Sequence, residues 1–85
     1  MEASIKCVLI NIDNVLITRI EEISAELGDP NCKLINPYRF YGEDDMRPWP
    51  EVSDQKEIMM RSEDILTIAD PKQEIIEKYL ELTKE

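Results

Sequence analysis

Residues 59–68, Met-Met-Arg-Ser-Glu-Asp-Ile-Leu-Thr-Ile, constrain the fold of this chain more than any other stretch. Two short apolar runs flank a polar turn, and Arg61 stands at the start of that turn. Short β-prone runs separated by polar residues are typical of a hairpin or a sharp strand corner. The stretch therefore predicts a late bend in a β-sheet protein, with strands at about 55–61 and 64–69.

Earlier apolar runs predict the other strands. Residues 5–10 are apolar and rich in β-branched side chains, and residues 11–14 supply an Asn- and Asp-rich turn. We therefore expect strands at about 5–10, 15–23 and 32–40. Residues 16–27 also have apolar residues at helical spacing before Gly28, so the pattern alone leaves strand and helix open there.

The last element of the chain has clear helix signals. Asp70 precedes Pro71, a pair typical of a helix start, and we expect Asp70 to be the N-cap. An apolar stripe follows, formed by Ile75, Ile76, Tyr79 and Leu80. The pattern predicts a helix from about 71 to 83. A helix of about 12 residues is marginal alone, so this one must dock on the sheet.

The length of the chain points to self-association. Its 85 residues suffice for one domain spanning 1–85. A domain this small buries roughly 60% of the surface of its unfolded chain, which makes its core marginal. Two cysteines and no apolar leader after Met1 argue against a disulfide scaffold, which leaves oligomerisation as the supplement. No apolar run approaches the roughly 20 residues of a membrane span, so we expect a soluble intracellular protein without a membrane partner.

Composition limits the chemistry. Nineteen acidic residues stand against 10 basic ones, and the net charge of −9 opposes contact with phosphates. The absence of histidine removes the commonest general base and the commonest zinc ligand. Cys7 and Cys32 lie among apolar neighbours, as reduced core thiols do. The acidic run at 43–45 reads as a solvated loop. We expect no enzyme, no metal and no cofactor.

A proline-flanked tryptophan marks the predicted loop at 42–54. Trp49 lies between Pro48 and Pro50, which stiffen the backbone on both sides. Tryptophan is enriched at interface hot spots, so the loop is a candidate contact surface for a protein partner. An indole that pins the loop to its own domain is an equally good alternative.

The late corner resembles the second signature of Sm-like proteins. In that family an apolar residue, Arg and Gly precede an apolar strand. Met60 and Arg61 match, Ser62 stands in place of the glycine, and Ile65 and Ile68 match the apolar positions.

The rest of the chain carries weaker parts of the same resemblance. Asn31, which leads the third predicted strand, is similar to the Asn of the first signature, although Asp29 lies closer to it than the family pattern has it. Nearly the whole chain resembles small proteins of marine-metagenome and cyanophage type through residues 28–38 and 64–71. If the chain is phage-encoded, its expected compartment is the host cytoplasm.

The resemblance implies an all-β fold, a small strongly bent five-stranded Sm-like barrel, here with a C-terminal α-helix where the family helix usually precedes the sheet. It also implies a homo-oligomeric ring, pentamer to heptamer, in which the fourth strand of one subunit pairs with the fifth strand of the next. The candidate protein-interface residues are Trp49 in the proline-flanked loop and, at the late corner where neighbouring subunits would pair, Ile58, Met60, Ile65 and Leu66.

Two functions remain as hypotheses. The first, implied by the resemblance, is a ring that binds single-stranded RNA at its pore through Asn31, Arg61 and Ser62. The second is a protein-interaction or assembly module that binds no nucleic acid, which the acidity favours. For Arg61 the alternative is an ion pair with Glu63, Asp64 or a neighbouring subunit, and for Asn31 it is loop hydrogen bonding.

Overall fold

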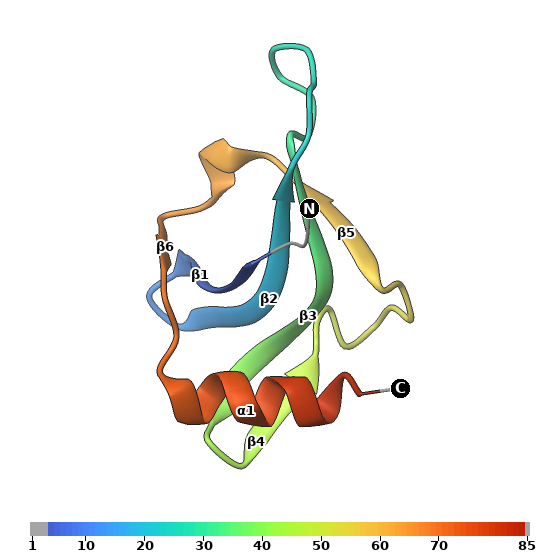
Figure 1. Ribbon diagram of the computed structural model, residues 1–85. Coiled ribbons are helices and arrows are strands. Elements are labelled where there is room, and N and C mark those ends of the chain that lie inside the picture. Colours follow the sequence, from blue (N-terminus) through green and yellow to red (C-terminus); the bar gives the residue numbers. More distant parts are fainter. Residues whose placement is uncertain (1–3, 85) are drawn as a thin grey trace.

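The structure is a computed structural model that describes residues 4–84, an antiparallel sheet with one C-terminal helix (Figure 1). The elements in chain order are β1 Ser4–Asn11, β2 Asn14–Glu22, β3 Cys32–Gly42, β4 Asp45–Pro48, β5 Glu57–Met60, the 3-10 turn η1 Ser62–Asp64, β6 Thr67–Ala69 and α1 Gln73–Leu82. The prediction of a β-rich fold with a C-terminal helix is confirmed.

The sheet is open. Its order is β4-β3-β2-β1-β6, and β5 also pairs with β3, along Cys32–Ile35. The pairings therefore place β5 and β6 at opposite ends of the sheet, and within residues 4–84 they do not pair with each other. The closed five-stranded barrel that we expected is not formed, because β5 and β6, which would have to meet, are not paired with each other within residues 4–84.

The first three strands were predicted to within a few residues. The open choice at residues 16–27 is decided for a strand: β2 runs to Glu22 and is followed by an irregular loop. This loop projects beyond the sheet between β2 and β3 (Figure 1). Leu16 and Ile17, adjacent in β2, pack into different core clusters on the two faces of the sheet. Because both faces are covered, this segment forms a strand despite the helical spacing of its apolar residues.

Three predictions about the second half of the chain were wrong. Residues 42–54 are not all loop, because β4 forms there, opposite Tyr38–Gly42. Its sequence, Asp-Met-Arg-Pro, lacks the apolar run of an interior strand, as edge strands do. The predicted strand at 64–69 is shortened to β6 by the 3-10 turn. Of the two alternatives predicted for residues 59–68, a hairpin or a sharp corner, the structure has the corner.

The third error concerns the start of the helix, which begins at Gln73 with Lys72 as its N-cap. Asp70 does not cap it, because its carboxylate pairs with the Lys6 ammonium of β1. Asp70 and Pro71 therefore follow the end of β6 at Ala69 and precede the helix, which begins at Gln73.

A β-bulge bends β3 sharply. Between the pairs Ile17↔Tyr38 and Arg19↔Ile35, two residues of β3 lie opposite a single residue of β2. The two residues are Asn36, whose φ of 51° is in the left-handed region, and Pro37, which has no N–H to donate. The sequence therefore places an Asn and a Pro where the ladder must be interrupted.

Two buried hydroxyls satisfy the carbonyl groups that the bulge releases. The Thr18 Oγ1 lies 3.1 Å from the Ile35 carbonyl oxygen. The Tyr79 hydroxyl, from α1, lies 3.0 Å from the same oxygen and 2.9 Å from that of Asn36. Both residues are fully buried, so the helix is tied to the bend of the sheet by a hydrogen bond as well as by packing.

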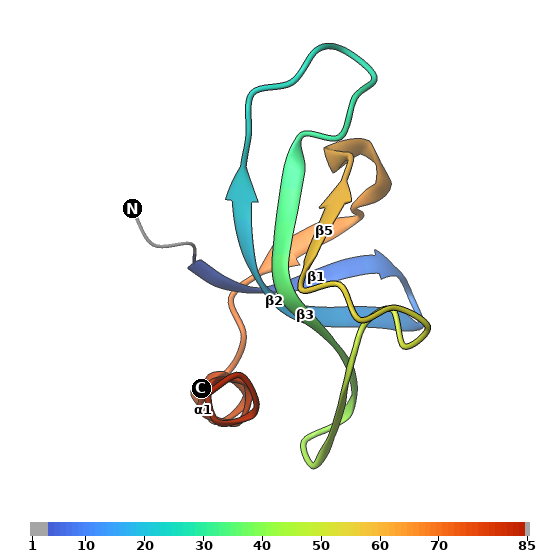
Figure 2. The ribbon, with the colours of Figure 1, turned by 90° about the vertical axis from the view of Figure 1, so that its right-hand side faces the viewer.

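The core has two parts, one on each face of the bent sheet. Between the sheet and the helix, Ile17, Met46, Ile75 and Tyr79 pack together. Inside the bend, Val8, Leu16 and Leu34 form the second cluster. Figure 2 shows the helix end-on, on one side of the strands and at the end away from the β2–β3 connection. Adjacent residues of β2 serve different clusters, as the alternation of a strand requires.

No helix formed by residues 4–84 combines the length and the apolar character that crossing a bilayer would need.

Candidate functional site

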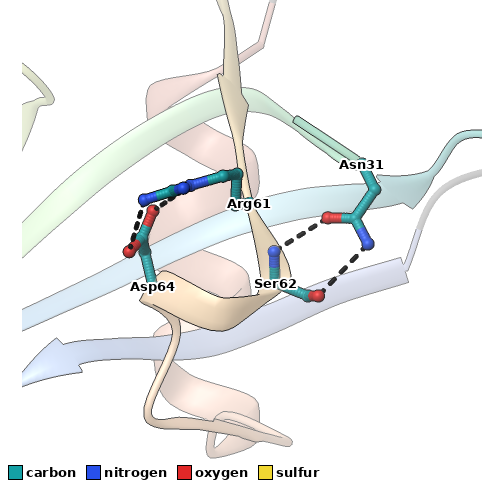
Figure 3. Close-up of polar contacts among 4 residues, drawn as sticks. All are labelled: Asn31, Arg61, Ser62 and Asp64. Atoms are coloured by element: carbon teal, nitrogen blue, oxygen red, sulfur yellow. Dashed lines mark hydrogen bonds and ion pairs between the residues drawn. The ribbon is translucent and has the colours of Figure 1, made fainter. Parts of the chain in front are cut away.

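The corner between β5 and β6 brings Asn31, Arg61 and Ser62 together (Figure 3). The Ser62 N–H donates to Asn31 Oδ1 at 2.8 Å, and Asn31 Nδ2 donates to Ser62 Oγ at 3.1 Å. Asn31 thus caps the first N–H of the 3-10 turn from 31 positions away in the sequence. The alternative role considered for Asn31 from the sequence, hydrogen bonding within a loop, is present in the structure, and its partner Ser62 is distant in the sequence.

Arg61 forms a two-point contact with Asp64. Its Nε lies 3.1 Å and its Nη2 3.4 Å from the two carboxylate oxygens, although the second contact is long for a hydrogen bond (Figure 3). Hydrogen bonding to Asp64 raises the pKa of Arg61 further above its already high value. The ion pair with Asp64, one of the alternatives considered from the sequence, is present. Both side chains are about half exposed, so solvent screens the pair and its contribution to stability is small.

The strand edges on either side of this corner are unpaired. β5 pairs only with β3 and β6 only with β1 within the described residues. The Asn36 N–H donates to the Lys56 carbonyl, one residue before β5 begins. Since antiparallel pairs alternate between bonded and non-bonded, the N–H and C=O groups of Glu57 and Met59 point away from β3. β5 therefore presents a free hydrogen-bonding edge.

These two edges carry exposed apolar side chains. Met59 on β5 is 45% exposed, Ile68 on β6 is 49% exposed, and Leu66 just before β6 is 64% exposed. β6 itself contains no charged residue. Native proteins usually blunt free edges with charges or proline. Neither device appears on β6, and β5 has only Glu57.

The third edge strand, β4, shows the contrast. It contains Asp45, Arg47 and Pro48 in four residues, and the Asp45 carboxylate pairs with the Arg47 guanidinium at 2.9 Å. Charges and a proline discourage pairing with another chain at this edge. The protein therefore protects one of its edges and leaves two unprotected.

The residues predicted for the interface divide by strand alternation. Ile58, Met60 and Ile65 are half-buried and pack against the cluster of Val8, Leu16 and Leu34. Of the five predicted residues, only Leu66 is mostly exposed. Met59 and Ile68, which the sequence reasoning missed as interface residues, are the exposed large apolar residues of β5 and β6. Strict alternation along β5, with Ile58 and Met60 facing the core, would have placed Met59 on the opposite, exposed face.

Trp49 is packed against its own domain. Its indole is half-buried beside the same cluster, and its backbone N–H donates to the Pro37 carbonyl at 2.9 Å. Of the two alternatives for Trp49, the structure has the one in which the indole packs against its own domain and holds the loop. Trp49 follows β4 directly, so the proline-flanked segment is held by the sheet.

The two thiols have the surroundings of core cysteines. Cys32 is buried and Cys7 is half-buried, and desolvation raises the pKa of both thiols. A raised pKa keeps a thiol protonated and unreactive at neutral pH. Within residues 4–84, no group of three or more His, Cys, Asp or Glu side chains is placed to hold a metal ion.

Fold and site together define a small antiparallel β-sheet protein with a capped corner between two unprotected strand edges. The chain belongs to a family of unknown function, DUF6561, whose profile matches residues 3–84. A search of curated proteins finds no match.

Proposed function

We propose that this protein is a self-assembling module in which β5 of one copy pairs with β6 of the next. The observation that carries the proposal is the pair of unprotected edges, each with exposed apolar side chains: Met59 on one, Leu66 and Ile68 on the other. β5 and β6 are the fourth and fifth strands of the Sm-like resemblance, which implies the same pairing. The proposal assigns no catalytic activity to the protein.

The topology supports a ring or a filament over a two-fold dimer. The two edges differ in sequence and lie at opposite ends of the sheet. A contact between two unlike surfaces is heterologous, so a copy that has bound one neighbour still has its other edge free for a second neighbour. Copies therefore add one after another until the rotation between them closes a ring, or they form an open filament. A closed ring, pentamer to heptamer, leaves neither the β5 edge nor the β6 edge free and supplies the burial that a chain of 85 residues needs. The strand pairing between copies would also complete the Sm-like sheet that the single chain leaves open.

Light scattering at increasing salt tests this proposal. We expect a mass that is a multiple of 9.9 kDa and an association that strengthens from about 50 to 500 mM NaCl. Each copy carries a net charge of −9, and salt screens the repulsion between copies. A mass of one chain at all salt and protein concentrations up to about 1 mM would remove the proposal.

A second candidate, binding of single-stranded RNA, is favoured by one observation: the three residues that the Sm-like resemblance implies for RNA contact lie together on an exposed corner. Two features oppose it. The Arg61 guanidinium is already occupied by Asp64, and the net charge repels phosphates. RNA binding would therefore have to open the Arg61–Asp64 pair.

Titration of a labelled U-rich or A-rich oligonucleotide distinguishes the candidates. If the corner binds RNA, affinity falls steeply with salt, opposite to self-association, and Arg61→Gln weakens it. Arg47→Gln is the matched control, since Arg47 is also an exposed arginine paired with a nearby aspartate. No binding at about 20 mM salt removes this candidate and leaves self-assembly standing.

A further inference from the structure

The corner that carries the Sm-like signature lies between the two proposed assembly edges. Six residues, 61–66, separate the end of β5 from the start of β6. β5 pairs with β3 and β6 pairs with β1, and these six residues join β5 and β6 directly, so they restrain how the two free edges are oriented relative to each other. In a head-to-tail assembly, that orientation sets the rotation from one copy to the next.

A ring closes only if the rotation from one copy to the next has the value that its subunit number requires. A ring of five needs about 72° per copy, a ring of six about 60° and a ring of seven about 51°. Neighbouring ring sizes thus differ by only about 10°. A single subunit number requires a corner held more tightly than an ordinary surface loop, which varies and moves more than the strands that it connects.

The corner is held at its start. Cys32 at the beginning of β3 pairs with Met60 at the end of β5. The next residue back along the chain, Asn31, binds both the N–H and the hydroxyl of Ser62 (Figure 3). The Asn31 carbonyl also accepts a hydrogen bond from the Ile23 N–H at 3.0 Å. Asn31 is therefore hydrogen-bonded to Ile23 through its backbone and to Ser62 through its side chain, so the position of the turn is coupled to the start of β3.

The corner is also held in its middle and at its end. The Asp64 and Ile65 N–H groups donate to the Arg61 and Ser62 carbonyls, and the Arg61–Asp64 ion pair spans the same turn. The Leu66 N–H donates to the Leu9 carbonyl of β1 at 2.8 Å. The six residues thus run from a contact with β3 to a contact with β1 through a hydrogen-bonded turn.

We propose that Asn31 and Ser62, with the Arg61–Asp64 pair, form a clamp that sets the subunit number of the assembly. This inference rests on the proposed self-assembly and gives these residues a positioning role in place of ligand contact. The Asn31–Ser62 bonds are the principal part, because they join two segments far apart in sequence. The exposed ion pair is weaker and is screened by salt.

Native mass spectrometry of the assembled protein tests the clamp. We expect one subunit number for the unchanged chain, and for Asn31→Ala a distribution over at least two neighbouring numbers, spaced by 9.9 kDa. Asn31→Asp, which keeps an acceptor for the Ser62 N–H but cannot donate to its hydroxyl, should broaden the distribution less. Arg61→Gln should have the smallest effect, vanishing at about 500 mM salt.

Ser53→Ala is the matched control, because the Ser53 hydroxyl also accepts a backbone N–H in an exposed loop, outside the corner. Its subunit number should equal that of the unchanged chain. Thermal unfolding of each variant confirms that it is folded before its mass is interpreted. A single unchanged subunit number for both Asn31 variants would overturn the clamp while leaving self-assembly intact. A monomeric unchanged chain would instead overturn self-assembly itself, and the clamp with it.

Discussion

Replacing Met59 with proline should reduce the assembly to single chains of 9.9 kDa without unfolding them. The Met59 N–H points away from β3, so proline removes no hydrogen bond of the folded monomer. It does remove a donor from the free edge, and its ring obstructs the approach of another strand. Light scattering at about 500 mM salt, where association is strongest, measures the mass.

Two further variants make this result specific to the edge. Met59→Thr also removes the apolar side chain but keeps the N–H and a strand-forming residue, so it should retain much of the assembly. Ile58→Pro places the proline at a position whose N–H faces β3, and it should lower the free energy of unfolding of the monomer itself. If Met59→Pro keeps the full mass, the β5 edge is not the contact.

Replacing Tyr79 with alanine should have the largest effect on stability, a loss of about 3–5 kcal/mol in the free energy of unfolding. Tyr79 is fully buried, and its ring lies edge-on to that of Tyr38 with centroids 5.9 Å apart. Small domains have about 5–15 kcal/mol in total, so this change should leave the helix poorly docked. Urea unfolding followed by far-ultraviolet circular dichroism measures the loss.

Tyr79→Phe separates the hydroxyl from the ring. It keeps the packing but leaves the Asn36 carbonyl without its helix donor, at a cost of about 1–2 kcal/mol. Tyr41→Phe is the control, because the Tyr41 hydroxyl is exposed and bonds to Glu51, and its loss should cost little. Equal losses for the two variants would contradict the role of Tyr79 at the bulge.

The same hydroxyl predicts a pH dependence. Burial raises the pKa of Tyr79, so the folded state favours the neutral phenol more than the unfolded state does. The resulting stability is present below the usual tyrosine pKa of about 10 and is lost as the pH rises through the higher folded value. Tyr79→Phe should lose less stability than the unchanged chain between about pH 9 and 11.

The sequence determined the parts of the fold that depend on apolar pattern. The runs at 5–10, 15–23 and 32–40 predicted β1, β2 and β3, because strands covered on both faces are rich in apolar and β-branched residues. The stripe centred on Tyr79 predicted α1. The resemblance to the two Sm-like signatures also selected Asn31 from the first and Arg61 and Ser62 from the second, and the fold does bring these three residues together.

Tertiary structure alone decided the remainder, since it depends on which groups meet in space. β4 exists because the turn after Gly42 brings a polar segment back onto the free edge of β3. Asp70 does not cap the helix, because Lys6 lies within reach across the sheet. The sheet stays open because β5 and β6 do not pair with each other within the described residues 4–84. Short-range pattern carries the preference of each segment, whereas pairing partners are set by contacts between residues far apart in the chain.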